Sequence, residues 1–204
     1  MLKGVALNDA IEQALKVVDR ELWVVTTAAG SERGGLVATW VSSASIDRER
    51  PVLLAGLAPN HFTAELVDRS QVVGLHLLRP EQMDLALNFA LGSGRTRDKF
   101  AGVDVRVGQT GAPLLNDCAA WFEGRVFARL ATGDRTFYWL DVVAAGRQEK
   151  VAIAREHDLF AAVTAEQKAQ LIADRDADVA LQRPWHDAWR ANLPPWLTPI
   201  NEAT

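Results

Sequence analysis

The sequence predicts a mainly β protein, built as an antiparallel barrel with helical insertions and followed by a helical C-terminal tail. Segments with strand patterns outnumber segments with helical periodicity until about residue 146. The helices expected between the strands are short and irregularly placed. This favours an antiparallel barrel over a parallel sheet of alternating strands and helices. We therefore expect one barrel over residues 1–150 and a helical, Trp-rich extension over residues 151–204.

Composition and charge narrow the classes of partner. The chain has 204 residues, of which 49% are hydrophobic and 24% charged, as in ordinary globular proteins, and its net charge is −4. This balance argues against nucleic acid or an anionic membrane surface as a partner. The lone cysteine, Cys118, excludes an intrachain disulfide, which fits a reducing cytoplasm. The N-terminal residues contain no long apolar run, so we expect neither a signal peptide nor a membrane span.

The first expected elements are a helix and a strand. Asn8 or Asp9 can cap a helix whose apolar side chains recur at helical spacing, and this helix should end near Asp19. A β-branched strand follows over residues 22–27. Residues 28–34 contain two glycines and a charge pair, which predicts a turn.

The stretch from residue 34 to residue 63 is the most informative part of the sequence. Residues 34–45 form an expected strand rich in small and hydroxyl side chains, which suits a flat or large group lying against the backbone. Residues 51–57 form a strand that is apolar on both faces. Asn60, His61 and Thr63 then bring polar groups to the start of a helix that Thr63 can cap, where an anion is favoured. The stretch fits either a flat, phosphate-bearing ligand or a plain barrel corner with a capped helix.

Later segments predict further strands and short helices. Helices are expected over residues 64–69 and from Pro80 to a C-terminal glycine at Gly92, followed by a basic loop. Strands are expected over residues 72–78, 103–107, 119–130 and 136–143. In the tail, Thr164 and Gln167 form a capping-box signature for a helix that runs to about Asp174. The charged residues 174–178 then predict a solvated bend.

Short motifs follow one another between residues 8 and 145. They are Val24-Val25-Thr26-Thr27, Gly35 through Ser43-Ala44-Ser45-Ile46-Asp47, Asp98-Lys99-Phe100, Gly111-Ala112-Pro113-Leu114-Leu115 and Gly133-Asp134-Arg135-Thr136. In this order they resemble the flavin reductase-like branch of the FMN-binding split-barrel family. The resemblance implies a Greek-key split β-barrel, a homodimer, and FMN bound at the subunit interface.

The resemblance also implies a set of cofactor-binding residues. The FMN phosphate needs hydroxyls, backbone N–H groups and a cation, and the flavin ring needs a flat slot with backbone donors at its edge. The residues carried over for these tasks are Val37, Ala38, Thr39, Trp40, Ser42, Ser43, Asn60, His61, Thr63, Arg97 and Lys99. Trp40 either stacks on the ring or points into the core, since neighbouring strand residues alternate in direction.

Two residues depart from the family pattern. His61 stands where the family usually has serine, although an imidazole can still donate to phosphate. Arg135 replaces the histidine that is associated with nicotinamide dinucleotide binding. An arginine cannot exchange a proton near neutral pH, but it can bind a pyrophosphate. Arg135 is therefore a candidate dinucleotide-binding residue, and its presence leaves the electron donor open.

The resemblance implies an FMN-dependent oxidoreductase that takes hydride from NAD(P)H and passes electrons onward, with a redox partner protein or a monooxygenase as acceptor. One alternative is a flavoredoxin-like electron carrier without a dinucleotide site. Another is a split-barrel binding protein without redox turnover. We expect no catalytic acid or base and no metal site, because the histidines lack metal-ligand spacing. The C-terminal tryptophans should pack on the barrel of the same chain or its partner, unless the tail covers the partner's flavin.

Overall fold

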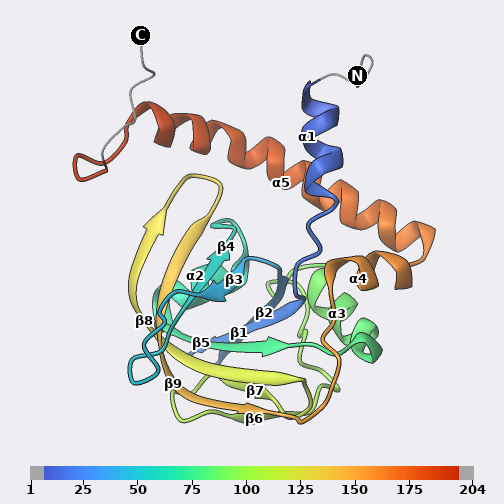
Figure 1. Ribbon diagram of the computed structural model, residues 1–204, viewed down its shortest axis with the longest axis vertical. Helices are drawn as coiled ribbons and strands as arrows, with labels where there is room; N and C mark the ends of the chain where they lie inside the picture. The colour runs from blue at the N-terminus through green and yellow to red at the C-terminus, as the bar shows by residue number, and fades with distance from the viewer. Residues whose placement is uncertain (1–6, 198–204) are drawn as a thin grey trace.

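The computed structural model describes residues 7–197 of the chain (Figure 1). Seven strands form one antiparallel sheet in the order β2-β1-β5-β8-β9-β4-β3, and β6 pairs with β7 in a small second sheet. The strands are β1 (Trp23–Ala29), β2 (Glu32–Ala38), β3 (Val41–Ser43), β4 (Val52–Leu57), β5 (Val72–Leu77), β6 (Val105–Val107), β7 (Pro113–Leu115), β8 (Ala120–Ala131) and β9 (Thr136–Arg147). The helices are α1 (Leu7–Leu15), α2 (Phe62–Ser70), α3 (Met83–Ala90), α4 (Glu156–Ala162) and α5 (Ala165–Ala191), with a 3₁₀ turn η1 (Pro80–Gln82) before α3.

The large sheet curls because its two edge strands are almost consecutive in the chain. β2 and β3 lie at opposite edges, yet only Thr39 and Trp40 separate them. So short a connection can be made only if the sheet bends until its edges approach each other. The backbone carbonyl of Trp40 accepts a hydrogen bond of 2.8 Å from the amide of Gly56 on β4, which secures this corner. The expected split β-barrel with helical insertions and a helical tail is confirmed.

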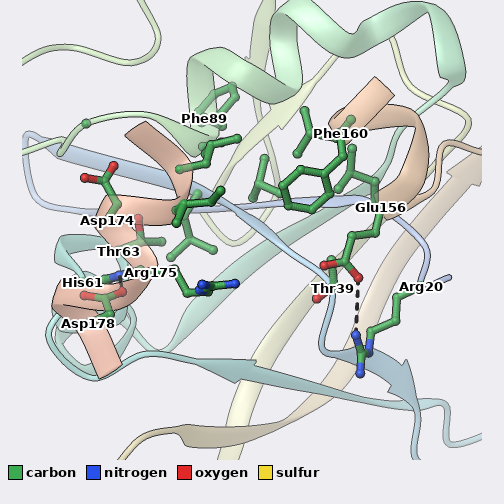
Figure 2. Close-up of a pocket in the computed structure, with 18 of the residues that line it drawn as sticks. Arg20, Thr39, His61, Thr63, Phe89, Glu156, Phe160, Asp174, Arg175 and Asp178 are labelled. Atoms are coloured by element: carbon green, nitrogen blue, oxygen red, sulfur yellow. Dashed lines mark hydrogen bonds and ion pairs between the residues drawn. The ribbon is translucent and has the colours of Figure 1, made fainter. Parts of the chain in front are cut away.

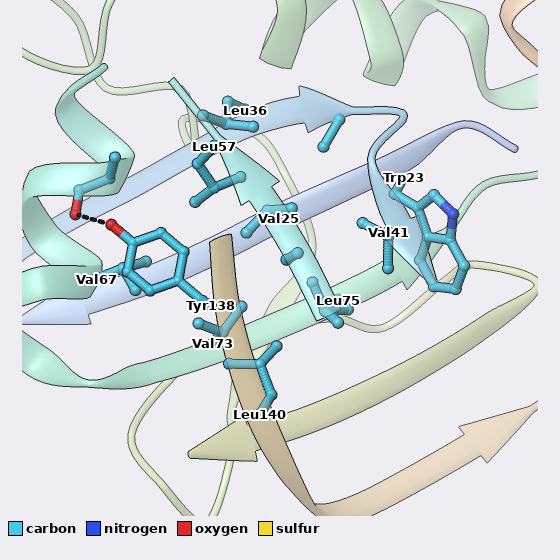
Figure 3. Close-up of a cluster of buried hydrophobic side chains, with 13 residues drawn as sticks. Trp23, Val25, Leu36, Val41, Leu57, Val67, Val73, Leu75, Tyr138 and Leu140 are labelled. Carbon is cyan, nitrogen blue, oxygen red and sulfur yellow. Dashed lines mark hydrogen bonds between the residues drawn. The ribbon is translucent and has the colours of Figure 1, made fainter. Parts of the chain in front are cut away.

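Alternate residues of the strands pack on the two faces of the curled sheet. In β1, Trp23 and Val25 enter the barrel interior, whereas Val24 faces a second apolar cluster beneath α3 and α4. The interior cluster gathers apolar side chains from six strands and from α2 (Figure 3). The Tyr138 hydroxyl donates to α2, where it has two acceptors, the carboxylate of Asp68 at 3.1 Å and the backbone carbonyl of Ala64 at 3.5 Å. Burial on both faces explains why β1 and β5 are apolar along nearly their whole length.

His76 on β5 is a buried polar group between the barrel and β7. Its Nδ1–H donates to the carbonyl of Val24 at 3.0 Å, and its Nε2 accepts from the amide of Leu115 at 3.1 Å. These two partners fix the neutral tautomer, because an amide can only donate and a carbonyl can only accept. Burial lowers the pKa of His76 to about 4. The imidazole therefore joins three strands only while it remains neutral.

Helix α5 lies across the end of the barrel that carries the tip of the β8–β9 hairpin (Figure 1). The tip touches the helix closely: a Cβ atom added to Gly133 would lie 2.5 Å from the backbone of Trp185 and His186. The preceding segment is tied to the barrel by two backbone hydrogen bonds, from Leu22 to Ala154 at 2.9 Å and from Ala154 to Leu78 at 2.8 Å. The segment at Ala154 and the part of α5 at Trp185 and His186 thus contact the barrel of their own chain.

Most element boundaries differ from expectation by a few residues, and four differences are larger or change an assigned role. The first helix ends at Leu15 rather than near Asp19. The turn expected over residues 28–34 is shorter, a two-residue hairpin loop that begins at Gly30. Gly30 has a φ of 63°, in the left-handed region that glycine adopts without steric cost. The single strand expected over residues 34–45 is split into β2 and β3. Thr63 does not cap α2, because His61 is the N-cap residue and Thr63 lies within the first turn.

The prediction of a solvated bend over residues 174–178 was wrong, because these residues are helical. The capping box at Thr164 is present, but the helix continues through the charged residues and past Pro184 to Ala191. Asp174 and Asp178 are spaced one turn apart and both face the barrel, where Asp178 has two hydrogen-bond partners. Contact with the barrel therefore outweighs the weak local helix preference of the aspartates.

Two other features concern a possible membrane span and the reactivity of the single cysteine. No helix within residues 7–197 combines the length and the apolar character needed to cross a lipid bilayer. Cys118 is buried, and burial raises the pKa of its thiol to about 11. A thiol with so high a pKa is a poor nucleophile, so this cysteine is a packing residue.

Candidate functional site

The candidate site is a cavity of about 1240 Å³ between the rim of the barrel and helices α1, α4 and α5 (Figure 2). The barrel contributes the end of β2 and the start of α2, and α3 with the following loop contributes a further wall. At one end, Arg20 pairs with Glu156 of α4 at 3.3 Å. At the other end, His61 lies beside Asp178 of α5. The barrel rim is thus covered by segments from both ends of the chain.

The end of β2 gives the cavity alternate side chains. Val37 and Thr39 line it, whereas Ala38 points the other way into the barrel interior. The next residue, Trp40, does not line the cavity: its ring stacks on Phe137 with the centroids 6.0 Å apart. Five residues were carried over for the edge of the flavin ring, namely Val37, Ala38, Thr39, Trp40 and Val41. Of these, Val37 and Thr39 line the cavity, whereas Ala38 and Val41 belong to the barrel core.

The serines carried over for the phosphate lie elsewhere. Ser42 and Ser43 are exposed on β3, beyond the break at Thr39 and Trp40, and neither lines the large cavity. The Ser43 hydroxyl donates to the carbonyl of Ser45 at 3.4 Å, which stabilises the following turn. The break between β2 and β3 turns these hydroxyls toward a different surface.

The start of α2 lies on the cavity wall and carries three of the expected residues. Asn60, His61 and Thr63 all line the cavity. Thr63 is only 3% exposed, and its hydroxyl makes no hydrogen bond to another residue within the described part of the chain. The first amides of a helix lack intrahelical acceptors and carry partial positive charge. The Thr63 hydroxyl and the first residues of α2 therefore lie at the same end of the cavity.

Of the two basic residues carried over as candidate phosphate ligands, Lys99 lines the cavity and Arg97 does not. The side chain of Lys99 is 5% exposed and donates to the carbonyl of Phe89 at 2.8 Å. Burial lowers the pKa of Lys99 to about 8, so the ammonium is charged at neutral pH with two N–H groups still able to bind an acceptor. Arg97 instead closes the end of α3 by donating to the carbonyls of Asn88 and Leu91.

The glycines of β2 accommodate side chains of the chain itself. A Cβ atom at Gly35 would lie 2.4 Å from the ring of Phe89, and one at Gly34 would lie 2.9 Å from the side chain of Leu66. The flat group that lies against this strand is therefore a phenylalanine ring of α3. The small residues at Gly34 and Gly35 follow from packing and are not by themselves a signature of a ligand.

Arg135 lies at the tip of the β8–β9 hairpin, outside the cavity wall. Its guanidinium donates to the side-chain carbonyl of Gln182 on α5 at 2.9 Å and stands 4.8 Å from the centroid of Trp40. Gln182 in turn donates to Asn60 at 2.7 Å. Arg135 thus belongs to a polar chain that joins the hairpin tip, α5 and the start of α2.

Sequence reasoning missed the helices that cover the rim. Helix α4 was not expected, and it contributes Glu156, Leu159 and Phe160 to the cavity. The contacts of Asp178 and Gln182 with the start of α2 were also missed, because the helix was expected to end near Asp174. A signal was present, since residues 174, 178 and 182 are polar at intervals of four, which places them on one face of a helix.

Two relatives share part of their sequence with this chain. It is 25% identical over 136 residues to Diflavin flavoprotein A 1 of Synechocystis sp. (strain ATCC 27184 / PCC 6803 / Kazusa), covering 66% of this chain and 23% of that protein. It is 31% identical over 126 residues to the "Probable flavin reductase" of Rhizobium meliloti (strain 1021), covering 61% of this chain and 39% of that protein. The chain spans about a quarter of the length of the diflavin flavoproteins that it matches.

A solved structure and a family model complete the comparison. The NADH:FAD oxidoreductase of Streptomyces globisporus C-1027, in complex with NAD and FAD fragments, has the same fold, with a TM-score of 0.65 and 23% identity over 75% of this chain and 91% of that one. The model of the flavin reductase like domain matches residues 16–164, which is most of the chain. The protein therefore belongs to the flavin reductase-like domain family.

Proposed function

We propose that the protein binds FMN in the cavity and acts as an oxidoreductase that takes electrons from NADH or NADPH and delivers them to a partner. The observation that carries this proposal is the pairing, in one cavity, of the buried Lys99 ammonium with the Thr63 hydroxyl at the start of α2. Beyond its bond to Phe89 the Lys99 ammonium keeps two N–H groups, and the Thr63 hydroxyl lines the same cavity, so both can bind an anionic ligand there. Flavin, when bound, supplies the redox chemistry by accepting hydride from a nicotinamide and passing the electrons on.

The residues present fit a flavin mononucleotide. A phosphate near neutral pH carries about −1.5 to −2 charges, and Lys99, the Thr63 hydroxyl and the first amides of α2 would hold it. Val37, Leu159 and Phe160 give apolar surface for a ring system, and Thr39 adds a hydroxyl to the wall. The chain's contribution is to bind and orient the cofactor and to exclude water, and no side chain is assigned a role as acid or base.

The size of the cavity leaves room for a second molecule. Small-molecule sites commonly occupy about 300–1,000 Å³, and this cavity is larger, at about 1240 Å³. A nicotinamide or a small electron acceptor could therefore share it with the flavin. The binding of NAD and FAD fragments by the Streptomyces globisporus oxidoreductase supports this arrangement.

A flavin-binding electron carrier is the second candidate, and one observation favours it. The hairpin tip at Gly133, which the family resemblance associates with the dinucleotide, lies directly against α5. Asp134 of this tip is 3.2 Å from His186 of the same helix. A dinucleotide could reach the tip only if the C-terminal half of α5 moved away.

A homodimer is part of the proposal, because apolar side chains of α1, of the segment after it and of α5 are exposed in the single chain. Three of them, Leu15, Val18 and Ile172, line the open cavity, and the others are Ile11, Val17, Val179, Leu181 and Trp185. Apolar patches of this kind mark interaction surfaces. A second copy would cover them and could complete the cavity. Light scattering that gave the mass of a single chain at micromolar concentration would contradict the dimer.

Anaerobic reduction tests the proposed function and separates its two candidates. The FMN-loaded protein is mixed with NADH or NADPH without oxygen, and the visible absorbance of the flavin is followed. We expect it to bleach faster than free FMN at the same concentration. Bound FMN that bleaches no faster than free FMN would contradict the reductase and favour the carrier.

Arg135→Ala is expected to lower the melting temperature without changing the KM for NAD(P)H, because the guanidinium already binds Gln182. Losing a hydrogen bond to a charged group costs roughly 1.5–3 kcal/mol, and each kcal/mol corresponds to about 2–4 °C in a chain of this size. Thermal melts and steady-state NAD(P)H oxidation are compared for wild type, Arg135→Ala and Arg135→His. A KM raised about ten- to a hundredfold, with unchanged melting, would instead place Arg135 on a dinucleotide phosphate.

A further inference from the structure

The start of α2, where the flavin phosphate is proposed to bind, already holds an anion of the protein itself. One carboxylate oxygen of Asp178 accepts from Nδ2 of Asn60 at 2.7 Å, and the other lies 2.7 Å from Nε2 of His61. Both contacts are short, and together they are bidentate, as a phosphate makes with two donors. Figure 2 shows the carboxylate of α5 directly beside His61 at this end of the cavity.

The neighbours of Asp178 hold its partners in this arrangement. Gln182, one turn further along α5, donates from Nε2 to Oδ1 of Asn60 at 2.7 Å. That bond fixes the orientation of the Asn60 amide and directs its N–H group toward Asp178. Gln182 is 3% exposed and is itself bonded by Arg135. The carboxylate is therefore built into the wall by a chain of hydrogen bonds that crosses three elements.

Asp178 and the proposed phosphate ligands line the same cavity. Thr63 follows His61 by two residues within the first turn of α2, and Lys99 faces the same space. A phosphate that reached Thr63 and the helix amides would come close to a second negative charge. Like charges at such distances repel strongly where solvent is partly excluded. The phosphate can accept hydrogen bonds from Asn60 and His61 only if their bonds to Asp178 are broken.

We infer that Asp178 is a specificity-determining residue, a resident carboxylate that competes with the flavin phosphate for Asn60 and His61. This inference rests on the proposed function. Asp178 weakens FMN binding by the wild-type protein, because its carboxylate occupies hydrogen-bond donors that the phosphate would use. Riboflavin has no phosphate, so Asp178 does not weaken its binding. The carboxylate thereby narrows the difference in affinity between the two flavins and couples FMN binding to a movement of α5.

The other role open to Asp178 is to anchor α5 and nothing more. The two roles differ in their effect on the two ligands. An anchor supports a wall that touches both flavins, so its loss changes both affinities alike. A competing anion affects only the ligand that carries the phosphate. The ratio of the two affinities therefore distinguishes the roles even in a variant whose α5 is loosened.

The test compares Asp178→Asn with wild type and with the control Asp176→Asn. Asp176 is an exposed neighbour on the same helix and pairs only with Arg175 among the described residues, so the control removes the same charge outside the cavity. Dissociation constants for FMN and riboflavin are measured by quenching of flavin fluorescence, beside thermal melts of each protein. We expect Asp178→Asn to raise the preference for FMN over riboflavin about tenfold, since a like charge is removed, and Asp176→Asn to leave it unchanged.

The outcomes are distinguishable. An unchanged preference in Asp178→Asn, with FMN still bound by the wild type, would overturn the inference and leave the proposed function intact. A parallel loss of both flavins would make Asp178 an anchor and would also overturn it. If neither the wild type nor Asp178→Asn bound FMN or riboflavin, the proposed function and the inference would fail together.

Discussion

Lys99→Met is expected to weaken FMN binding about ten- to a hundredfold while leaving riboflavin binding nearly unchanged. Lys99 is the buried cation of the cavity, and a charge-assisted hydrogen bond contributes roughly 1.5–3 kcal/mol. Methionine keeps the length and most of the volume of the side chain, so the cavity wall is preserved. Dissociation constants for both flavins, measured by fluorescence quenching, check the expectation.

The control and the pH dependence sharpen this prediction. Lys150→Met removes an exposed lysine outside the cavity and should change neither affinity. Because the pKa of Lys99 is about 8 in the free protein, the wild type should lose FMN affinity as the pH rises above that value. The Lys99→Met protein should not show this loss. Equal FMN affinity in Lys99→Met and wild type would remove Lys99 from the phosphate site.

The free energy of unfolding is expected to fall by about 3 kcal/mol between pH 6.5 and pH 4 on account of His76 alone. Its pKa is lowered to about 4 in the folded protein by burial, whereas an exposed histidine titrates near 6.5. Between pH 4 and pH 6.5 this histidine is protonated in the unfolded chain and neutral in the folded chain. Stability from this group is therefore complete above pH 6.5 and is lost as the pH falls toward 4.

Urea unfolding at several pH values measures this effect, with His76→Gln as the comparison. Glutamine keeps a donor and an acceptor but does not titrate, so its stability should depend less on pH across this range. Where the variant folds poorly, the imidazole resonances of the wild type give the same answer, since His76 should stay neutral at pH 6. Identical pH profiles for both proteins, or a His76 that titrates near 6.5, would contradict the buried neutral histidine.

The barrel could be predicted from the sequence because strand patterns are local. The mostly apolar run at 72–78, interrupted by His76, follows from burial of β5 on both faces. The alternation at 103–107 indicated the strand β6, although Val107 is 79% exposed. The break between Ala38 and Val41 could not be predicted, because it comes from closing the barrel. Its consequence for the site was large: it separated Ser42 and Ser43 from the cavity that Thr39 lines.

The part of the site on the barrel rim was within reach of the sequence, and the part on the helices was not. Asn60, His61 and Thr63 were found because polar residues at a helix start have a local signature. Asp178 was not, because its role depends on where a distant helix docks, and its charged neighbours favoured a solvated bend. The glycines at residues 34 and 35 were conspicuous, yet they serve the packing of Phe89 and Leu66.

The cavity between the barrel rim and α5 is proposed to bind flavin. Equilibrium titration of FMN into the apo-protein, followed by flavin fluorescence, tests this proposal most directly, with Thr39→Trp as the comparison. Thr39 lines the cavity, and an indole in its place would fill the space without entering the barrel core. We expect saturable quenching by the wild type with a Kd of about 1 μM or tighter, near −8 kcal/mol, and loss of this quenching in Thr39→Trp at an unchanged melting temperature. No saturable quenching by the wild type, or undiminished binding by Thr39→Trp, would contradict it.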